Sequence, residues 1–241
     1  NMLHEVYGSK PSNFQVQDTG DLGVAEGSSR SLAIAGEVLY YLSRAGMMAY
    51  SGGLPAQIGQ GFGPARFHGA VAGSDGLKYY VSMADITSRH LFAFDTAKGI
   101  WHREDGLQVL DFGYVGRNLY ALSADGKLWA LGRPVDVAGT AETSVESLAE
   151  FGDFYNSSPD KKGVVKLQFR IDMEAGASIR LFINYDGGAW LPVRTLTATE
   201  KRSYYLPVPL KRVDHYRLKI EGTGMYQIYS LAREVSAGSA L

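Results

Sequence analysis

The residues best suited to catalysis are carboxylates in the first half of the chain, namely Asp95, Glu104, Asp105, Asp111 and Asp125. A retaining glycoside hydrolase needs two carboxyl groups about 5–5.5 Å apart, one acting as acid and one as nucleophile. Asp125 precedes a glycine, however, and an Asp-Gly step commonly forms a turn in which the carboxylate bonds to the backbone. A glycoside hydrolase therefore remains only the second alternative function.

The histidines do not form a recognisable ligand set. No two of them stand two or four positions apart in one element, and the chain has no cysteine, which excludes thiolate metal sites and thiol catalysis. Asp214 and His215 are neighbours in a strand and point to opposite faces, so they cannot act as orienter and base of a triad. We therefore name no catalytic, cofactor-binding or metal-binding residue and predict no cofactor, and a triad assembled from distant residues stays open. The five histidines are His4, His68, His90, His102 and His215.

A glycine-rich stretch at residues 59–63, GQGFG, invites comparison with a phosphate-binding loop. It lacks the Lys-Ser/Thr pair that follows such a loop, and no helix follows whose N-terminus could hold an anion. We interpret it as a connection between repeated units.

Aromatic residues offer a third kind of chemistry, because sugar rings stack on exposed Trp and Tyr side chains. In tyrosine-rich all-β proteins, however, such residues usually form cross-strand packing pairs. Packing is the favoured interpretation here, and a carbohydrate-binding module for host recognition is the first alternative function. The residues concerned are Trp101, Trp129 and Trp190 and the tyrosine pairs at 40–41, 79–80 and 204–205.

The composition excludes several classes of protein. The 241 residues carry a net charge of −1, which does not favour a nucleic-acid or anionic-membrane binder. The charge is uneven, with 11 Lys+Arg against 17 Asp+Glu in residues 1–153 and 13 against 8 in residues 154–241. No signal peptide and no apolar run of the roughly 20 residues needed to cross a bilayer is visible.

A repeat of about 40 residues is the strongest pattern. Ser43, Ser82 and Ser123 each close a short strand, and an aromatic residue precedes each serine by three positions, at Tyr40, Tyr79 and Tyr120. Units of this length built from short strands are typical of β-propeller blades, which need neighbours to cover their faces. In the middle unit we expect strands at 67–74, 77–83, 90–95 and 100–104. Because propellers have four to eight blades and about three are visible, we predict an incomplete propeller belonging to a longer one, and an open packing of the sheets is the alternative.

From residue 164 the pattern changes to longer alternating strands. We expect Val165, Leu167, Phe169 and Ile171 to face a core, because polar residues alternate with them. Further strands are predicted at 178–186, 189–196, 202–209, 215–222 and 225–235, with an Asp186-Gly187-Gly188 hairpin turn. The chain is thus predicted to be all-β, with propeller-like repeats in residues 1–153 followed by an antiparallel β-sandwich, jelly-roll or immunoglobulin-like, in residues 154–241.

Several phrases in this order resemble one known family. They are YGSKPSNFQVQ, LYYLSRAGMMAYSGGLPAQI, LFAFDTAKGIWHRED, NLYALSADGKLWAL and LPVPLKRVDHYRLKIEGTGMYQIYSLAREV. Together they resemble the C-terminal part of a virion structural protein of tailed bacteriophages and prophages, similar to the tail-hub or stabilisation type. The resemblance covers nearly the whole chain.

The resemblance implies an architectural role without catalytic residues. It implies that other virion or tail proteins, or copies of the same chain, are the partners, with a glycan as a further ligand for host recognition. It places the protein in the virion, or in the host cytoplasm during assembly. The favoured expectation is therefore a non-enzymatic tail or portal-proximal component that acts through protein contacts.

Overall fold

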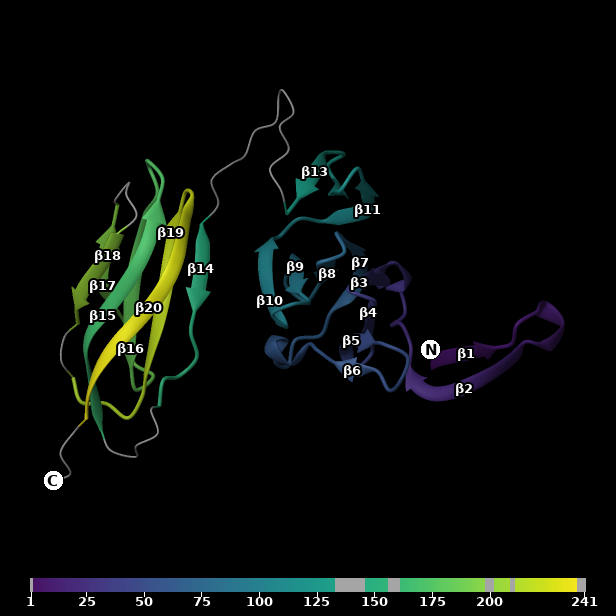
Figure 1. Cartoon of the computed structure of the whole chain (residues 1–241), viewed down its shortest axis with the longest axis horizontal. Coiled ribbons are helices and arrows are strands. Elements are labelled where there is room, and N and C mark those ends of the chain that lie inside the picture. Colours follow the sequence, from purple (N-terminus) through teal and green to yellow (C-terminus); the bar gives the residue numbers. More distant parts are fainter. Residues whose placement is uncertain (1, 133–145, 156–160, 198–201, 209–210, 238–241) are drawn as a thin grey trace. The chain divides into compact units, whose positions relative to one another are not determined.

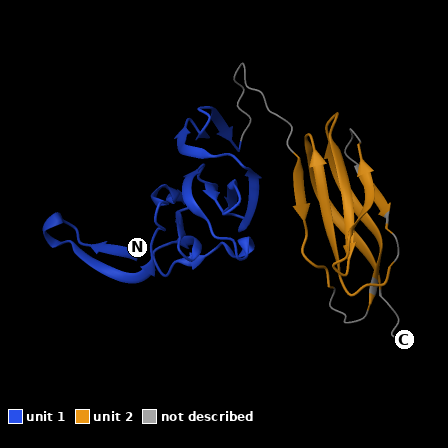
Figure 2. Ribbon diagram, turned by 180° about the vertical axis from the view of Figure 1, so that it is seen from behind, with its two compact units in different colours: residues 1–140 blue, residues 141–241 orange. Residues whose placement is uncertain are grey.

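The chain folds almost entirely as β-strands in a computed structural model, which describes residues 2–132, 146–155, 161–197, 202–208 and 211–237 (Figure 1). Within these residues the only helical elements are three short 3-10 turns. The chain divides into two compact units, residues 1–140 and 141–241 (Figure 2). The prediction of an all-β chain with propeller-like repeats followed by an antiparallel sandwich is confirmed.

Unit 1 begins with a hairpin of β1 (Met2–Tyr7) and β2 (Gln15–Leu22). Three antiparallel sheets follow, and we name them blades 1 to 3 in chain order. Blade 1 comprises β3 (Ala33–Ala35), β4 (Val38–Ser43), β5 (Gly46–Tyr50) and β6 (Ala56–Gln57). Blade 2 comprises β7 (His68–Ser74), β8 (Lys78–Ala84), β9 (Arg89–Asp95) and β10 (Ile100–Asp105). Blade 3 comprises β11 (Val109–Val115), β12 (Asn118–Ser123) and β13 (Leu128–Leu131).

Each blade has a row of the same kind across its first three strands: a small residue, a tyrosine and an alanine. The rows are Ala33–Tyr40–Ala49, Gly73–Tyr80–Ala93 and Gly113–Tyr120–Ala130. The small residue and the tyrosine each recur every 40 residues. Tyr40 is buried in a core shared by blades 1 and 2, and Tyr80 in a core shared by blades 2 and 3. Tyr40 and Tyr80 therefore each face the following blade, which is how successive propeller blades stack.

The serine alignment of the sequence is off by one residue in the middle blade. Tyr79, which it matched with Tyr40 and Tyr120, faces backwards and lies 5.3 Å from the Tyr40 ring, whereas Tyr80 faces forwards. All three serines are buried. Ser43 and Ser123 bond within their own hairpins, but Ser82 donates to Leu107 O in the connection to blade 3. Because side chains alternate along a strand, a slip of one residue reverses the face.

Ser123 closes the hairpin turn that precedes β13. Its buried hydroxyl accepts from Trp129 Nε1 at 3.0 Å, and its single proton is directed at the Asp125 carboxylate, with Lys127 O also within 3.0 Å. The Ser-Ala-Asp-Gly-Lys-Leu-Trp run is thus a structural turn.

We expect Ser123→Ala to lower the free energy of unfolding by about 1–2 kcal/mol, because it removes the hydrogen bonds of a buried hydroxyl that holds the turn. Denaturant unfolding measures this change. Ser230→Ala, at an exposed position of the other unit, is the control and should change stability by less than about 0.5 kcal/mol. An equal effect of the two substitutions would contradict this role for Ser123.

Unit 2 is a sandwich of two antiparallel sheets with strand orders β14-β19-β16-β17 and β18-β15-β20. Its strands are β14 (Ser147–Glu150), β15 (Lys162–Met173), β16 (Ser178–Tyr185), β17 (Trp190–Leu196), β18 (Arg202–Pro207), β19 (Tyr216–Thr223) and β20 (Tyr226–Ala237). The Asp186-Gly187 turn joins β16 to β17 with positive φ at both residues, as an Asp-Gly hairpin requires.

One core position of the sandwich differs from the prediction. Leu167, Phe169 and Ile171 are fully buried as expected, but Val165 is exposed and Val164 is buried in its place. The pairing of β15 with β20 shifts between Val164 and Lys166, and this bulge turns the strand by one residue.

The boundary between the units also lies earlier in the chain than residue 153. β14 pairs with β19, and Phe151 and Phe154 pack on the core of the sandwich, so this segment belongs to unit 2. Residues 133–145, which include the division between the units, lie outside the described residues.

Candidate functional site

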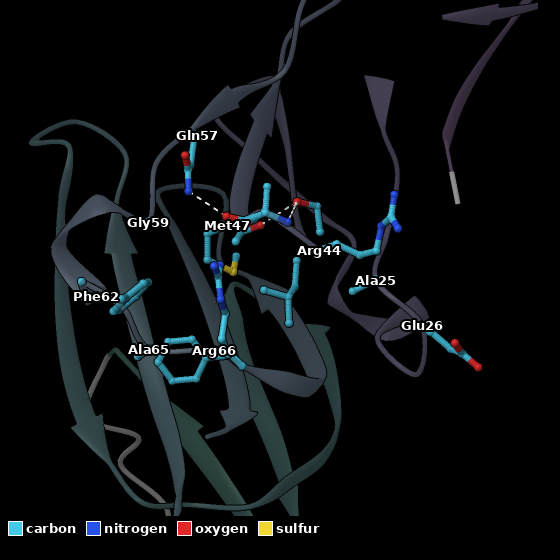
Figure 3. A pocket seen from close by; sticks show the side chains of 15 residues that line it. Ala25, Glu26, Arg44, Met47, Gln57, Gly59, Phe62, Ala65 and Arg66 are labelled. Atoms are coloured by element: carbon cyan, nitrogen blue, oxygen red, sulfur yellow. Dashed lines mark hydrogen bonds between the residues drawn. The ribbon is translucent and has the colours of Figure 1, made fainter. Parts of the chain in front are cut away.

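A pocket of about 320 Å³ opens at one end of blade 1, and we name it the arginine pocket (Figure 3). One wall is the turn between β4 and β5, and the other is the connection from blade 1 to blade 2. The lining residues are Ala25, Glu26, Leu42, Ser43, Arg44, Ala45, Gly46, Met47, Gln57, Gly59, Phe62, Gly63, Ala65, Arg66 and Phe67.

The first wall is held by hydrogen bonds inside a tight turn. The Ser43 hydroxyl accepts from Ala45 N at 3.0 Å and donates to Gly46 O at 3.0 Å. Gly46 has φ 119°, which favours glycine. Gln57 Nε2 donates to Ala45 O at 2.7 Å, and this bond ties β6 to the turn. Arg44, the first residue of the turn, is therefore presented at the rim of the pocket.

The second wall is the glycine-rich stretch, and the structure confirms that it connects two blades. Its 3-10 turn places Phe62 against the rings of Phe67, Phe92 and Trp101, at centroid distances of 5.2, 4.8 and 5.0 Å. An ideal Cβ built on Gly59 would lie 3.3 Å from Met47 N, so glycine permits this close approach of the chain to β5. The sequence interpretation did not foresee that this connection also lines a pocket.

The pocket carries an excess of positive charge. Arg44 and Arg66 are both exposed, and among the described residues neither guanidinium has an ion pair or hydrogen bond. Glu26 is the one carboxylate in the lining. Figure 3 shows the Arg66 side chain extending into the pocket, whereas Arg44 lies at its rim. Two unpaired guanidinium groups beside a hollow suit a ligand that carries a carboxylate or another anion.

The five candidate carboxylates are each engaged by local partners. Asp95 accepts from the backbone N–H of Lys98, which lowers the pKa of its carboxyl, and Asp105 accepts from Leu107 N. A hydrogen bond from the Ser123 hydroxyl lowers the pKa of Asp125 to about 2. Glu104 bonds to His102 at 2.8 Å and Asp111 faces Arg30 at 3.7 Å. Among the described residues, no interaction joins any two of these five carboxylates.

Most of the candidate aromatic residues pack inside the protein. Tyr40, Tyr41, Tyr79 and Tyr80 are buried. The Trp101 indole N–H donates to Ile58 O at 2.8 Å, and the Trp129 indole bonds to Ser123. The Trp190 ring lies beneath Lys219 Nζ, 5.2 Å from its centroid, and the Tyr205 ring lies beneath Lys166 Nζ in the same way. Both rings thus have a lysine ammonium group over one face.

The histidines occupy separate places. His90 and Asp85 bond at 3.0 Å in a turn of blade 2, and His4 pairs with Asp18 in the first hairpin. His215 lies 3.8 Å from an Asp186 oxygen, not beside the Asp214 carboxylate. Within the described part of the chain, no three His, Asp or Glu side chains cluster as metal ligands would, and no helix is apolar and long enough to cross a membrane.

Comparison with known proteins yields similarity to solved structures alone. No family model and no curated protein matches the sequence. The chain is similar to exo-β-1,3-galactanase from Phanerochaete chrysosporium with galactose, at 11% identity and a TM-score of 0.26 over 80% of this chain. Two variants of that enzyme with β-1,3-galactotriose match at 12% and 9% identity, with TM-scores of 0.25 and 0.24 over 80% and 94% of this chain.

The chain spans only part of the length of these enzymes, 65% in the first two structures and 68% in the third. At these identities the similarity concerns the fold alone.

These comparisons contradict the prediction of a virion structural protein. The matching structures belong to a carbohydrate-active enzyme, and no virion or tail protein is found among the matches that we report. They also give no support to the expected absence of enzymatic activity. The physical reason for the error is that strand repeats and alternating patterns encode a fold, and one fold serves many functions.

Proposed function

We propose that the protein binds carbohydrate, and that the arginine pocket takes a sugar unit bearing a carboxylate, such as a uronic acid. The observation that carries this proposal is the pair of unpaired arginines, Arg44 and Arg66, beside a hollow with an aromatic wall. A guanidinium group forms paired hydrogen bonds with a carboxylate, and Phe62 and Phe67 offer apolar surface to a sugar ring. The volume of about 320 Å³ lies at the small end of ligand sites, which suits one or two sugar units.

The pocket is better suited to binding than to hydrolysis. Glycosidic cleavage by the common mechanisms uses two carboxyl groups on either side of the bond, and the lining supplies only Glu26. The similarity to exo-β-1,3-galactanases does not carry this proposal, which rests on the groups present in the pocket.

Titration calorimetry with oligosaccharides of uronic acids and with neutral oligosaccharides of equal length tests the proposal. We expect the acidic series to bind and its affinity to fall as salt is added, because partly exposed charges are screened. Arg66→Gln should weaken binding about 10- to 100-fold, since a hydrogen bond to a charged group contributes about 1.5–3 kcal/mol.

The control is Arg103→Gln, which removes an exposed arginine of β10 outside the pocket and should leave the affinity unchanged. Absence of binding to any acidic sugar, or equal losses in the two variants, would refute the proposal. Incubation of the protein with the bound oligosaccharide, followed by analysis of the products, separates a binding protein from a hydrolase.

A further inference from the structure

Blade 3 has one covered face and one open face. The face that carries Leu119 and Ala121 packs against blade 2. The opposite face has an apolar groove of about 520 Å³, which we name the Tyr120 groove. The groove is lined by Asp111, Phe112, Gly113, Val115, Tyr120, Leu122 and Leu128. Leu128 is 67% exposed, so a considerable apolar surface faces water.

The groove lies along the row of Gly113 and Tyr120 in blade 3, and blade 3 covers the equivalent row of blade 2. There the ring of Phe112 packs over Gly73, and an ideal Cβ on Gly73 would lie 2.5 Å from Phe112 Cβ. At the same position of blade 3, an ideal Cβ on Gly113 would meet nothing within 4 Å. The groove therefore contains an open slot beside Gly113, and the equivalent slot beside Gly73 is filled by the Phe112 ring.

The β1–β2 hairpin carries an exposed aromatic side chain that suits this slot. Phe14 packs over Gly8 near the turn and remains 52% exposed, and the paired Val6 and Val16 are exposed as well. A two-stranded hairpin is at best marginally stable by itself in water, so an apolar hairpin that projects from its sheets gains from a partner. In unit 1 the hairpin projects away from the strands of blade 3 that line the groove (Figure 1).

We propose that the Tyr120 groove binds the β1–β2 hairpin of a second copy of this chain, with Phe14 inserted beside Gly113. Charge is compatible with this pairing, because Lys10, near the hairpin turn, has no ion pair among the described residues. Asp111 at the groove has an exposed ion pair with Arg30 at 3.7 Å and keeps room for a second cation. The contact is heterologous, since the groove of one copy receives the hairpin of the other. The contact involves neither the arginine pocket nor its proposed ligand, so either proposal can fail without the other.

Sedimentation velocity of the full chain over a range of concentrations tests the inference. We expect wild-type protein to self-associate as its concentration rises. Gly113→Val fills the slot at a site with open space and an ordinary φ, so the fold should tolerate it. Phe14→Ser removes the inserted ring. Each variant alone should associate at least about ten times more weakly than the wild type.

Mixing the two variants provides the decisive measurement. The Gly113→Val chain keeps its hairpin and the Phe14→Ser chain keeps its groove, so the mixture should associate more strongly than either variant alone. Monomeric wild-type protein would overturn the inference. Loss of association in Gly113→Val but not in Phe14→Ser would also overturn it, because the groove would then receive another occupant, such as the groove of a second copy.

Discussion

Gly73→Val is expected to destabilise unit 1 by about 3 kcal/mol or more, one of the two largest effects among the substitutions considered. Gly73 stands beside Tyr80 in the row of blade 2, and the Phe112 ring of blade 3 occupies the space that a side chain would need. Even a methyl group would lie 2.5 Å from Phe112 Cβ, so the two blades would have to separate. Overpacking a tight interface typically costs about 1–3 kcal/mol, and displacement of a strand backbone adds to this.

Gly113→Val is the matched control for this prediction. It makes the same substitution at the same row position of the next blade, where nothing lies within 4 Å of the added carbon. At protein concentrations too low for association, its free energy of unfolding should stay within about 0.5 kcal/mol of the wild type. Chemical denaturation of the two variants measures the contrast. Equal destabilisation would show that glycine is needed for the strand backbone and not for the fit between blades.

Tyr79→Ala should lower the free energy of unfolding by about 3–5 kcal/mol, the range found when large buried side chains are truncated. Tyr79 is fully buried between blades 1 and 2, 5.3 Å from the Tyr40 ring and 6.2 Å from the Trp101 ring. Its hydroxyl donates to Ser31 O at 2.7 Å, and its burial raises the pKa of the phenol well above the usual value. The phenol therefore stays neutral, and the hydroxyl remains a donor, throughout the pH range in which the protein is handled.

Tyr79→Phe separates the contribution of the hydroxyl to stability from that of the ring. It keeps the packing and removes the bond to Ser31 O, so we expect a loss of about 1–2 kcal/mol. Denaturant unfolding at neutral pH gives both values. A loss for Tyr79→Phe as large as that for Tyr79→Ala would contradict the view that ring packing between the blades dominates.

Most strands could be predicted from the sequence because alternation and turn residues are local signals. The four strands of blade 2 and the six long strands of unit 2 lie within a residue or two of the predicted ranges. What the sequence did not reveal is which face each residue occupies where the register shifts. Both Tyr79 and Val165 were placed on the wrong side, in one case by a misaligned repeat and in the other by a bulge.

The candidate site was harder to predict because its residues come from separate segments. Arg44 ends up beside the second wall only because the β4–β5 turn and the connection between blades fold against each other. Neither arginine stands in a motif, and the sequence gives no sign that they lack partners. Carboxylates and tryptophans attracted attention by residue type, but in the structure they cap turns or fill interfaces.

The row of small residue, tyrosine and alanine limits how the length of unit 1 can vary. The small residue and the tyrosine recur every 40 residues, so duplication or deletion of a whole unit would preserve the face that each blade presents to the next. Insertion of a single residue within β8 would instead turn Tyr80 away from blade 3 and present the wrong surface to both neighbours. Changes in length are therefore tolerable as complete blades or within the turns, and not inside the middle strands.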